Sequence, residues 1–327
     1  MRKGSIMGEI RVSFVIPCYR SENTVLAVVE EIEETMRGHS ADAFEIILVN
    51  DGSPDGVWQV IRRRACEDGH VTGVDLAKNF GQHCALMAGY HQARGDYIVS
   101  LDDDGQTPAD RVFELLEALD RGYDVAFASY EEQHRNLIRR WGSDFAHKMT
   151  HYMLNVREDF PKGSSFFAMK RFVRDEIIRY EHPYPYIAGL LFRTTRNITM
   201  IPMHHRNRLS GASGYSMKKL ISLWMNGFTA FSVKPLELGA LIGFLFAVFG
   251  FLFALFVIIR KIIRPEIQAG WSSTLSAIMI VGGIIMILLG LIGEYVGRIY
   301  ICLNKSPQFV VKEITGEKEE RNDHETR

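Results

Sequence analysis

Two long stretches without charged residues lie near the C-terminal end of the chain, at Leu238–Ile259 and Ala269–Gly293. A helix of about 20 apolar residues crosses the hydrocarbon core of a bilayer, so each stretch is long enough to span a membrane. The residues before them are rich in charge and alternate between short apolar runs and amphipathic stretches. The chain is therefore expected to join a water-soluble domain to two transmembrane helices, at about 236–260 and 270–294.

The composition narrows the class of protein and the compartment. Charged residues make up 24% of the chain and the formal net charge is −1, which gives no reason to expect a nucleic acid as partner. Cys18, Cys66, Cys84 and Cys302 form no CxxC pair, and they are expected to be reduced thiols. The N-terminus has no apolar core behind a basic start, so no signal peptide is predicted. We expect the soluble domain to stay in the cytoplasm.

The first half of the chain alternates between strand and helix patterns. The expected strands are short apolar runs at Ile10–Ile16, Phe44–Val49, Val71–Leu76, Tyr97–Leu101 and Val125–Ala128. The expected helices lie near Thr24–Arg37, Val57–Glu67, Gln82–Arg94 and Ala109–Leu119. This alternation predicts the α/β class, with a mostly parallel sheet covered by helices. Ligands of such sheets bind at the carboxyl ends of the strands.

The pattern divides the chain into four segments. Residues 1–215 are expected to form the cytosolic domain, 216–234 an amphipathic helix, 235–300 the two spans, and 301–327 a cytosolic tail. The amphipathic stretch leads into the first span, which favours a helix lying in the membrane interface. Packing of its apolar side against the soluble domain is the alternative.

An acidic cluster follows the fourth expected strand. Side chains of alternate residues can point to one place, so Asp102 and Asp104, with the amide oxygen of Gln106, offer hard oxygen ligands for Mg²⁺ or Mn²⁺. Such an ion stabilises a departing diphosphate. The alternative is an ordinary polar turn, but adjacent carboxylates repel one another and favour a bound cation.

Two further strand ends carry polar residues. Asp51 follows the second strand, where its carboxylate either accepts hydrogen bonds from a nucleotide or belongs to an Asp-Gly turn before a helix. Lys78 precedes another helix, where it and the backbone N–H groups are suited to an anion.

Six motifs occur in an order that is found in a known family. They are Pro17-x-Tyr19, Asn50-Asp51-Gly52-Ser53, Lys78-Asn79-Phe80-Gly81-Gln82-His83, Asp102-x-Asp104-x-Gln106-x-Pro108, Gly211-x-Ser213-x-Tyr215-Ser216 and Gly293-Glu294-Tyr295-x-Gly297-Arg298. On these motifs the chain resembles the polyprenyl-phosphate glycosyltransferases of glycosyltransferase family two, from about Val12 to Lys312.

The resemblance implies a GT-A fold that moves a sugar from a nucleotide-sugar to a lipid phosphate with inversion at the anomeric carbon. The residues implied for the donor site are Pro17, Tyr19, Glu22, Asp51, Lys78, Asp102 and Asp103. Asp102, Asp104 and Gln106 are implied for the metal and the diphosphate. The chain departs from the family pattern at Arg20, where Asn is frequent, and at Gly163–Phe167.

Basic side chains are the candidates for binding the acceptor phosphate. A phosphate monoester is already largely ionised near neutral pH, so it needs cations that hold it beside the donor diphosphate more than it needs a base. The candidates are Arg135, Arg139, Arg206 and Arg208, with Ser213. Arg206 is also assigned, with Asp102 and Asp104, to catalysis. The alternative for the arginines is a solvated surface or a contact with lipid headgroups.

Together these residues predict an inverting, metal-dependent glycosyltransferase of the inner or plasma membrane. It would use Mg²⁺ or Mn²⁺ to pass a sugar from a nucleotide-sugar, with UDP favoured, to undecaprenyl phosphate. A lipid without phosphate or a saccharide is the alternative acceptor. Both termini are expected in the cytoplasm, although basic residues flank the hairpin and also occupy its connecting loop at Arg260 and Arg264. A homo-oligomer is a further expectation.

Overall fold

The structure is a computed structural model, and it describes residues 11–39, 43–130, 164–204, 234–263, 270–304 and 306–316. The chain forms two compact units, which are described separately. One unit comprises Met1–Ser216 with Pro307–Arg327, and the other comprises Met217–Ser306. The first unit is therefore built from two parts of the sequence, on either side of the second.

The first unit contains one sheet whose strand order is β7-β5-β6-β4-β1-β2-β3-β8. The strands are β1 (Val12–Cys18), β2 (Phe44–Asn50), β3 (Val71–Leu76), β4 (Tyr97–Ser100), β5 (Val125–Tyr130), β6 (Phe167–Lys170), β7 (Ile198–Met203) and β8 (Val311–Thr315). The helices are α1 (Val25–Gly38), α2 (Val57–Glu67), α3 (Gln82–Gln92), η1 (Ala109–Arg111), α4 (Val112–Asp120), α6 (Arg171–Ile177) and α7 (Ile187–Thr194).

The four central strands are parallel, as the apolar runs predict. β1 pairs with β2 on one side and with β4 on the other, and β2 pairs with β3. Every residue of β1 and β2 is buried, which is typical of a parallel strand with helices on both faces. The outer strands make the sheet mixed, because β6 is antiparallel to both β4 and β5, and β8 is antiparallel to β3.

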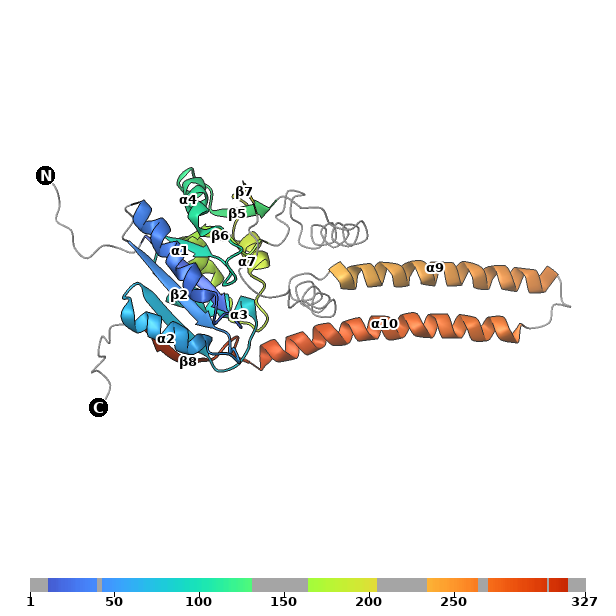
Figure 1. Cartoon of the computed structure of the whole chain (residues 1–327). Coiled ribbons are helices and arrows are strands. Elements are labelled where there is room, and N and C mark those ends of the chain that lie inside the picture. The colour runs from blue at the N-terminus through green and yellow to red at the C-terminus, as the bar shows by residue number, and fades with distance from the viewer. Residues whose placement is uncertain are drawn as a thin grey trace, which may run out of the picture. The chain divides into compact units, whose positions relative to one another are not determined.

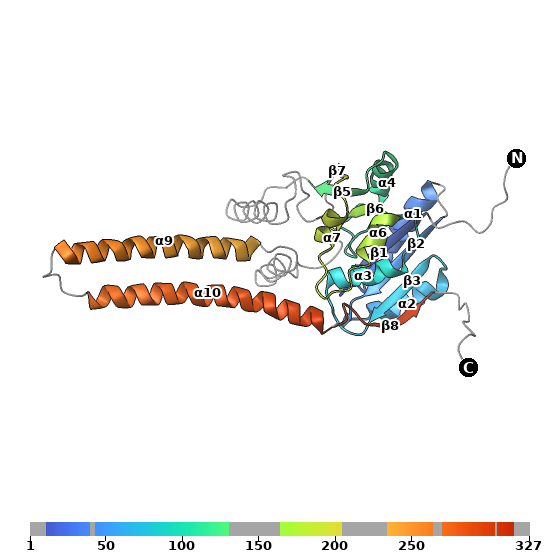
Figure 2. The ribbon, with the colours of Figure 1, turned by 180° about the vertical axis from the view of Figure 1, so that it is seen from behind.

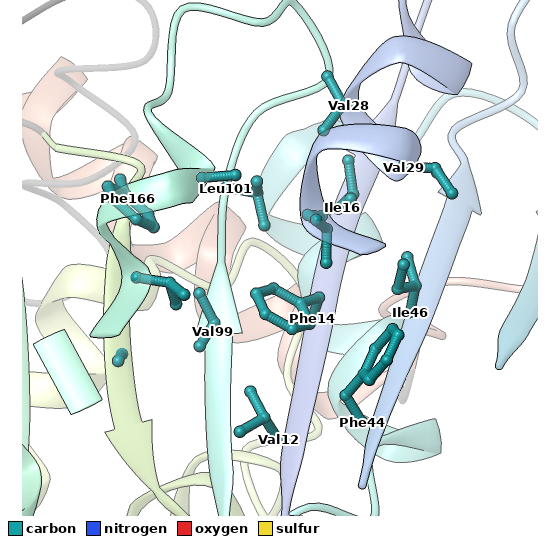
Figure 3. Close-up of a cluster of buried hydrophobic side chains, with 14 of the residues drawn as sticks. Val12, Phe14, Ile16, Val28, Val29, Phe44, Ile46, Val99, Leu101 and Phe166 are labelled. Atoms are coloured by element: carbon teal, nitrogen blue, oxygen red, sulfur yellow. The ribbon is translucent and has the colours of Figure 1, made fainter. Parts of the chain in front are cut away.

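Helices cover both faces of this sheet. On one face, apolar residues of α1, α2 and α4 join alternate residues of the central strands in the core, including Phe14 and Ile46 (Figures 1 and 3). On the opposite face lie α3 and α6 (Figure 2). There α3 approaches the strands closely, since a Cβ on Gly89 would clash with a methyl group of Val15.

Strand β8 lies in a segment that was expected to be only a tail. The prediction of a cytosolic tail at 301–327 did not include a strand, but Val311–Thr315 forms the edge of the sheet beside β3. This segment is short and contains two charged residues, so its composition gives a weak strand signal, and the free edge of β3 is what orders it.

The second unit contains two long helices, α9 (Lys234–Ile263) and α10 (Trp271–Leu303). Among the described residues, Ile280–Leu303 is by length and composition a candidate membrane span. Gly239–Phe253 is a shorter apolar stretch within α9. The candidate span lies later in the chain than the expected 270–294. Large apolar side chains such as Phe249, Phe251 and Ile287 are exposed on these helices, as lipid-facing residues would be. The amphipathic helix expected at 216–234 lies almost wholly outside the described residues.

Candidate active site

The candidate site lies where the carboxyl ends of β1 and β4 meet. In the sheet, β1 has β2 on one side and β4 on the other. The chain builds outward from β1 through β2 and β3 and then returns to the other side of β1 with β4, so the strand order reverses between β1 and β4. A crevice outside the strand ends forms at such a reversal, and ligands of open α/β sheets bind in it. Tyr19 and Asp102 come just after these two strand ends, and the backbone N–H of Tyr19 donates to Asp103 Oδ2 at 3.0 Å.

The three consecutive aspartates point to different partners. Asp102 accepts hydrogen bonds from Gln82 Nε2 at 2.9 Å and from the hydroxyl of Ser165. Asp103 turns toward the loop after β1, where burial raises its pKa and the N–H of Tyr19 partly offsets that rise. Asp104 Oδ1 accepts from the backbone N–H of Gln106 at 3.0 Å. The turn is possible because Gly105 adopts a φ of 72°.

Tyr130 experiences the negative charge of both Asp102 and Asp104. Burial raises the pKa of Tyr130 to about 12, and the negative charges of Asp102 and Asp104 add to that rise. Both carboxylates therefore lie near the same phenol, while Asp103 faces the loop after β1. The convergence of Asp102 and Asp104 on one metal ion stays a prediction.

The donor set at Asp102 and Asp104 fits a hard divalent cation. Both side chains supply hard carboxylate oxygens, and among their contacts are those described above with a hydroxyl, a side-chain amide and a backbone amide. Within the described residues, no group of three or more His, Cys, Asp or Glu side chains is arranged so that it could hold a metal ion by itself. A cation held here would take its remaining ligands from phosphate and water, which is the usual arrangement for Mg²⁺.

Asp51 fixes the start of α3. Its Oδ1 accepts from the backbone N–H of Phe80 at 2.7 Å, and its Oδ2 accepts from that of Gly81 at 2.9 Å. The carboxylate is buried, which raises its pKa, and the two N–H donors partly offset this rise. The side chain thus pairs the two backbone amides that directly precede α3, and it attaches the end of β2 to the loop that carries Lys78.

Gly52 brings the same two segments into direct contact. It has a φ of 56°, and a Cβ at this position would clash with the carbonyl carbon of Lys78. Only glycine allows this approach together with this backbone conformation. The side chain of Lys78 is exposed at the strand ends, and its ammonium lies 5.1 Å from the centre of the Phe80 ring.

The loop after β1 carries the other predicted donor-site residues. Pro17 is buried within β1, whereas Tyr19 is 44% exposed and Arg20 lies over its ring, with 5.5 Å from the guanidinium carbon to the ring centre. Glu22 Oε2 accepts from the backbone N–H of Gly56 at 3.0 Å, so it attaches this loop to the turn after β2. Arg20 has a φ of 59°, an uncommon conformation for a residue other than glycine.

The predicted acceptor-site residues lie outside the described residues. These are Arg135, Arg139, Arg206, Arg208 and Ser213. Their assignment to the acceptor phosphate therefore stays a prediction.

Sequence reasoning gave no role to three residues that the fold brings to the site. Gln82 stands inside a recognised motif, and Ser165 stands where the chain departs from the family pattern, yet both donate to Asp102. Tyr130 lies at the end of β5, and nothing in its local sequence marks it. The pairing of β4 and β5 with β6 brings the segments of Asp102, Tyr130 and Ser165 together.

Comparisons with known proteins agree with this architecture. Residues 13–180 match the family described as Glycosyl transferase family 2, and residues 234–299 match the family described as GtrB C-terminal hairpin. A relative from Bacillus subtilis (strain 168), named uncharacterized glycosyltransferase YkcC, is 30% identical over 308 residues, covering 94% of this chain and 95% of that protein. A relative from Yersinia enterocolitica, named undecaprenyl-phosphate 4-deoxy-4-formamido-L-arabinose transferase, is 31% identical over 318 residues, covering 96% of this chain and 97% of that protein.

A solved structure shows the same fold. Glucosyl-3-phosphoglycerate synthase from Mycobacterium tuberculosis, in complex with Mn²⁺, uridine-diphosphate-glucose and phosphoglyceric acid, has a TM-score of 0.50 and 18% identity. The likeness covers 69% of this chain and 82% of that chain. The expected GT-A fold with a C-terminal hairpin is thereby confirmed.

Proposed function

The chain belongs to glycosyl transferase family 2, and on that premise we propose that it passes a sugar from a UDP-sugar to polyprenyl phosphate with inversion at the anomeric carbon. The observation that carries the proposal is the meeting of the Asp102–Asp104 cluster with the loop after β1 where the strand order reverses. A nucleotide-sugar fits this place, because the exposed ring of Tyr19 offers a face for a base and the acidic cluster offers ligands for a cation beside the diphosphate.

The membrane hairpin and the relatives support a lipid acceptor. The second unit matches a hairpin family over residues 234–299, and it presents apolar helices long enough to enter a bilayer. The Yersinia enterocolitica relative is named as an undecaprenyl-phosphate transferase, and it aligns along nearly the whole chain, hairpin included. Both observations favour a polyprenyl phosphate over a water-soluble acceptor.

In the proposed reaction an oxygen of the acceptor phosphate attacks C1 of the sugar from the side opposite the diphosphate. The new C1–O bond forms as the old one breaks, and the electron pair of the broken bond leaves with the nucleoside diphosphate. The acceptor phosphate has a second pKa of about 6, so it is mainly a dianion at neutral pH and loses no proton in this step. The transition state has oxocarbenium character, as in other glycosyl transfers.

The residues of the chain have separate tasks in this reaction. Asp102 and Asp104, with Gln106, would hold Mg²⁺ or Mn²⁺, an ion that stabilises negative charge on the leaving diphosphate when it is bound. Asp103 holds the N–H of Tyr19, and Asp51 holds the start of α3, so both shape the donor site. Arg206 and Arg208, with Arg135, Arg139 and Ser213, would orient the acceptor phosphate by guanidinium and hydroxyl donors.

The fold supports the proposed placement in the membrane. β8 follows the hairpin in sequence and pairs with β3 of the first unit, so both ends of the hairpin would lie on one side of the membrane. An even number of crossings follows from this, which supports two spans. We assign that side to the cytoplasm, where nucleotide-sugars are made and where Cys18, Cys66, Cys84 and Cys302 stay reduced. Association of copies of the chain stays a prediction.

The test is a transfer assay with the full chain in liposomes containing undecaprenyl phosphate. The donor panel contains UDP-glucose and UDP-linked 4-deoxy-4-formamido-L-arabinose, and diacylglycerol liposomes test the alternative acceptor class. Asp104→Asn is expected to lower turnover by about a hundredfold or more, since it weakens charge stabilisation in the transition state. Asp96→Asn, an exposed carboxylate before β4, is the matched control and is expected to leave turnover unchanged. Unchanged turnover in Asp104→Asn would contradict the role of the acidic cluster.

The acceptor assignment needs its own variant. Arg206→Ala is expected to lower transfer to lipid phosphate more than it lowers hydrolysis of the donor by water. Equal losses in both reactions would count against a role of Arg206 at the acceptor phosphate.

A further inference from the structure

The segment that follows the membrane hairpin contacts the first unit at several places. We call Gln308–Thr315 the C-terminal strap. The side-chain amide of Gln308, which is 8% exposed, donates to the carbonyl oxygens of Tyr180 at 3.0 Å and His182 at 2.9 Å. The carbonyl of Val310 accepts from the N–H of Ala77 at 2.9 Å. Residues Val311–Thr315 of the strap form β8, beside β3 (Figure 2).

One residue of the strap interrupts the regular pairing of β8 with β3. Asp75 pairs with Glu313 and Leu76 pairs with Val311, so Lys312 is an extra residue on β8 with no partner position on β3. Such a bulge turns the side chain of the extra residue away from its regular direction. The ammonium of Lys312 lies 3.0 Å from Asp75 Oδ2.

Asp75 is a buried carboxylate that needs this positive charge. It is 3% exposed, and its Oδ1 accepts from Asn50 Nδ2 at 2.6 Å. An ionised group in such a place is costly unless it is paired and hydrogen-bonded. Lys312 supplies the opposite charge from the solvent side, because its own side chain is 64% exposed.

Asn50 connects Asp75 to the turn after β2. Its amide orientation is fixed, since Nδ2 donates to Asp75 while Oδ1 accepts from the N–H of Ser53 at 3.1 Å. The hydroxyl of Ser53 in turn accepts from the N–H of Arg20 at 2.8 Å. Lys312, Asp75, Asn50 and Ser53 thus form one chain of contacts from the strap to the loops that carry Asp51 and Tyr19.

We propose that Lys312 is a positioning residue for the donor site, which holds the turn at Asp51–Asp55 in place through Asp75 and Asn50. The consequence for catalysis rests on the proposed function, whereas the ordering of the turn does not. Lys312 lies shortly after Leu303, the end of α10, so the hairpin and the donor site are joined by a short covalent path. The C-terminal strap must therefore be paired with β3 and Asp75 for the donor to bind tightly.

The first experiment measures hydrogen exchange of the full chain in nanodiscs without any ligand. Lys312→Met keeps the apolar stem of the side chain and removes its charge. The backbone amides of residues 51–56, apart from Pro54, are expected to exchange about tenfold faster, which corresponds to about 1.4 kcal/mol. Lys312→Arg should keep the exchange of the parent protein. Arg62→Met is the matched control, because Arg62 pairs with Glu313 of the same strand at 3.3 Å and stands outside the chain of contacts.

A second variant separates lost charge pairing from lost folding. In the double variant Asp75→Asn with Lys312→Met, both members of the ion pair are neutral, so no buried charge is left unpaired and no ammonium is required. Its exchange at residues 51–56 is expected to return toward that of the parent protein. Thermal unfolding of each variant shows whether the whole domain is intact.

The third measurement is a titration with UDP and with GDP in the presence of Mn²⁺. Lys312→Met should weaken the affinity for the bound nucleotide about tenfold. It should raise KM for the donor more than it lowers kcat, and Arg62→Met should change neither. Parent protein that binds neither nucleotide would contradict the proposed donor site, and the exchange data would still decide the ordering of the turn. Unchanged exchange and unchanged affinity in Lys312→Met would overturn the proposal.

Discussion

At the scale of single residues, burial shifts the pKa of several titratable groups around the site. Asp51 and Asp103 are kept in place by backbone N–H donors, so their carboxylates order the loops around the site. Burial raises the pKa of both groups from the ordinary value of 3.8. Their contribution to stability is therefore largest below that value and is lost as pH rises through the folded-state pKa.

His83, at the start of α3, shifts in the opposite sense. Burial lowers the pKa of His83 from 6.5 to about 4, and its Nδ1 has no hydrogen-bond partner among the described residues. The folded protein therefore favours the neutral ring. The stabilisation from this residue is complete above pH 6.5 and is lost as pH falls toward 4.

We predict that His83→Phe weakens the dependence of the melting temperature on pH between 6.5 and 4. Phenylalanine keeps an aromatic ring against Tyr186, whose ring centre is 5.5 Å away, and it cannot gain a proton. The measurement is thermal unfolding over this pH range. The control is His39→Phe, because His39 is exposed and its ring stacks on Phe113. Its melting temperature should depend on pH as that of the parent protein does. Identical profiles for parent and His83→Phe would disprove the prediction.

At the scale of elements, the site depends on turns that only one residue type allows. Gly52→Ala is predicted to lower the free energy of unfolding by about 1–3 kcal/mol, because a positive φ and a close backbone contact coincide there. With alanine at position 52, the turn after β2 must move away from the loop that carries Lys78, so donor binding should weaken as well. Gly38→Ala, at a glycine with open space around it, should leave stability unchanged or raise it by up to about 1 kcal/mol. Equal effects of the two changes on chemical denaturation would contradict this argument.

The two helices of the hairpin meet through small residues. A Cβ on Gly239 of α9 would lie 2.8 Å from a methyl group of Leu288 in α10, and Gly243 stands one turn further along. In a membrane, such glycines let helices approach closely. Gly239→Val is predicted to destabilise the hairpin by about 1–3 kcal/mol through overpacking.

The control for this change is Gly250→Val, at a glycine of α9 where a Cβ would meet no atom within 4 Å. Thermal unfolding of both variants in nanodiscs gives the comparison. If Gly250→Val proved as harmful as Gly239→Val, a general effect of valine in α9 would explain the data instead of helix contact.

At the scale of the whole molecule, the proposed two crossings with cytoplasmic ends can be tested at the segment between α9 and α10. We predict that alkaline phosphatase fused after Gly270, between the two helices, is active in bacterial cells. A fluorescent protein fused after Arg327 should be folded and bright in the cytoplasm. An inactive phosphatase after Gly270, or a dark fluorescent protein after Arg327, would contradict two crossings with cytoplasmic ends.

Much of the architecture could be predicted from the sequence. The apolar runs gave β1 to β5 within a few residues, and α2 was predicted with its observed bounds. Two uncharged stretches likewise indicated the hairpin. These features depend on local periodicity and on length, which are properties of a continuous segment. The charge count around the hairpin could not decide its orientation, because basic residues occur on both sides.

The tertiary structure alone decided which distant segments meet. Val311–Thr315 becomes a strand because β3 offers an unpaired edge, and Lys312 reaches Asp75 because a bulge falls at that position. Asp103 accepts from the N–H of Tyr19 and Asp102 accepts from the hydroxyl of Ser165, so two neighbouring carboxylates have partners from distant parts of the chain. Such contacts join residues far apart in sequence, and strand register, which no local pattern encodes, brings them together.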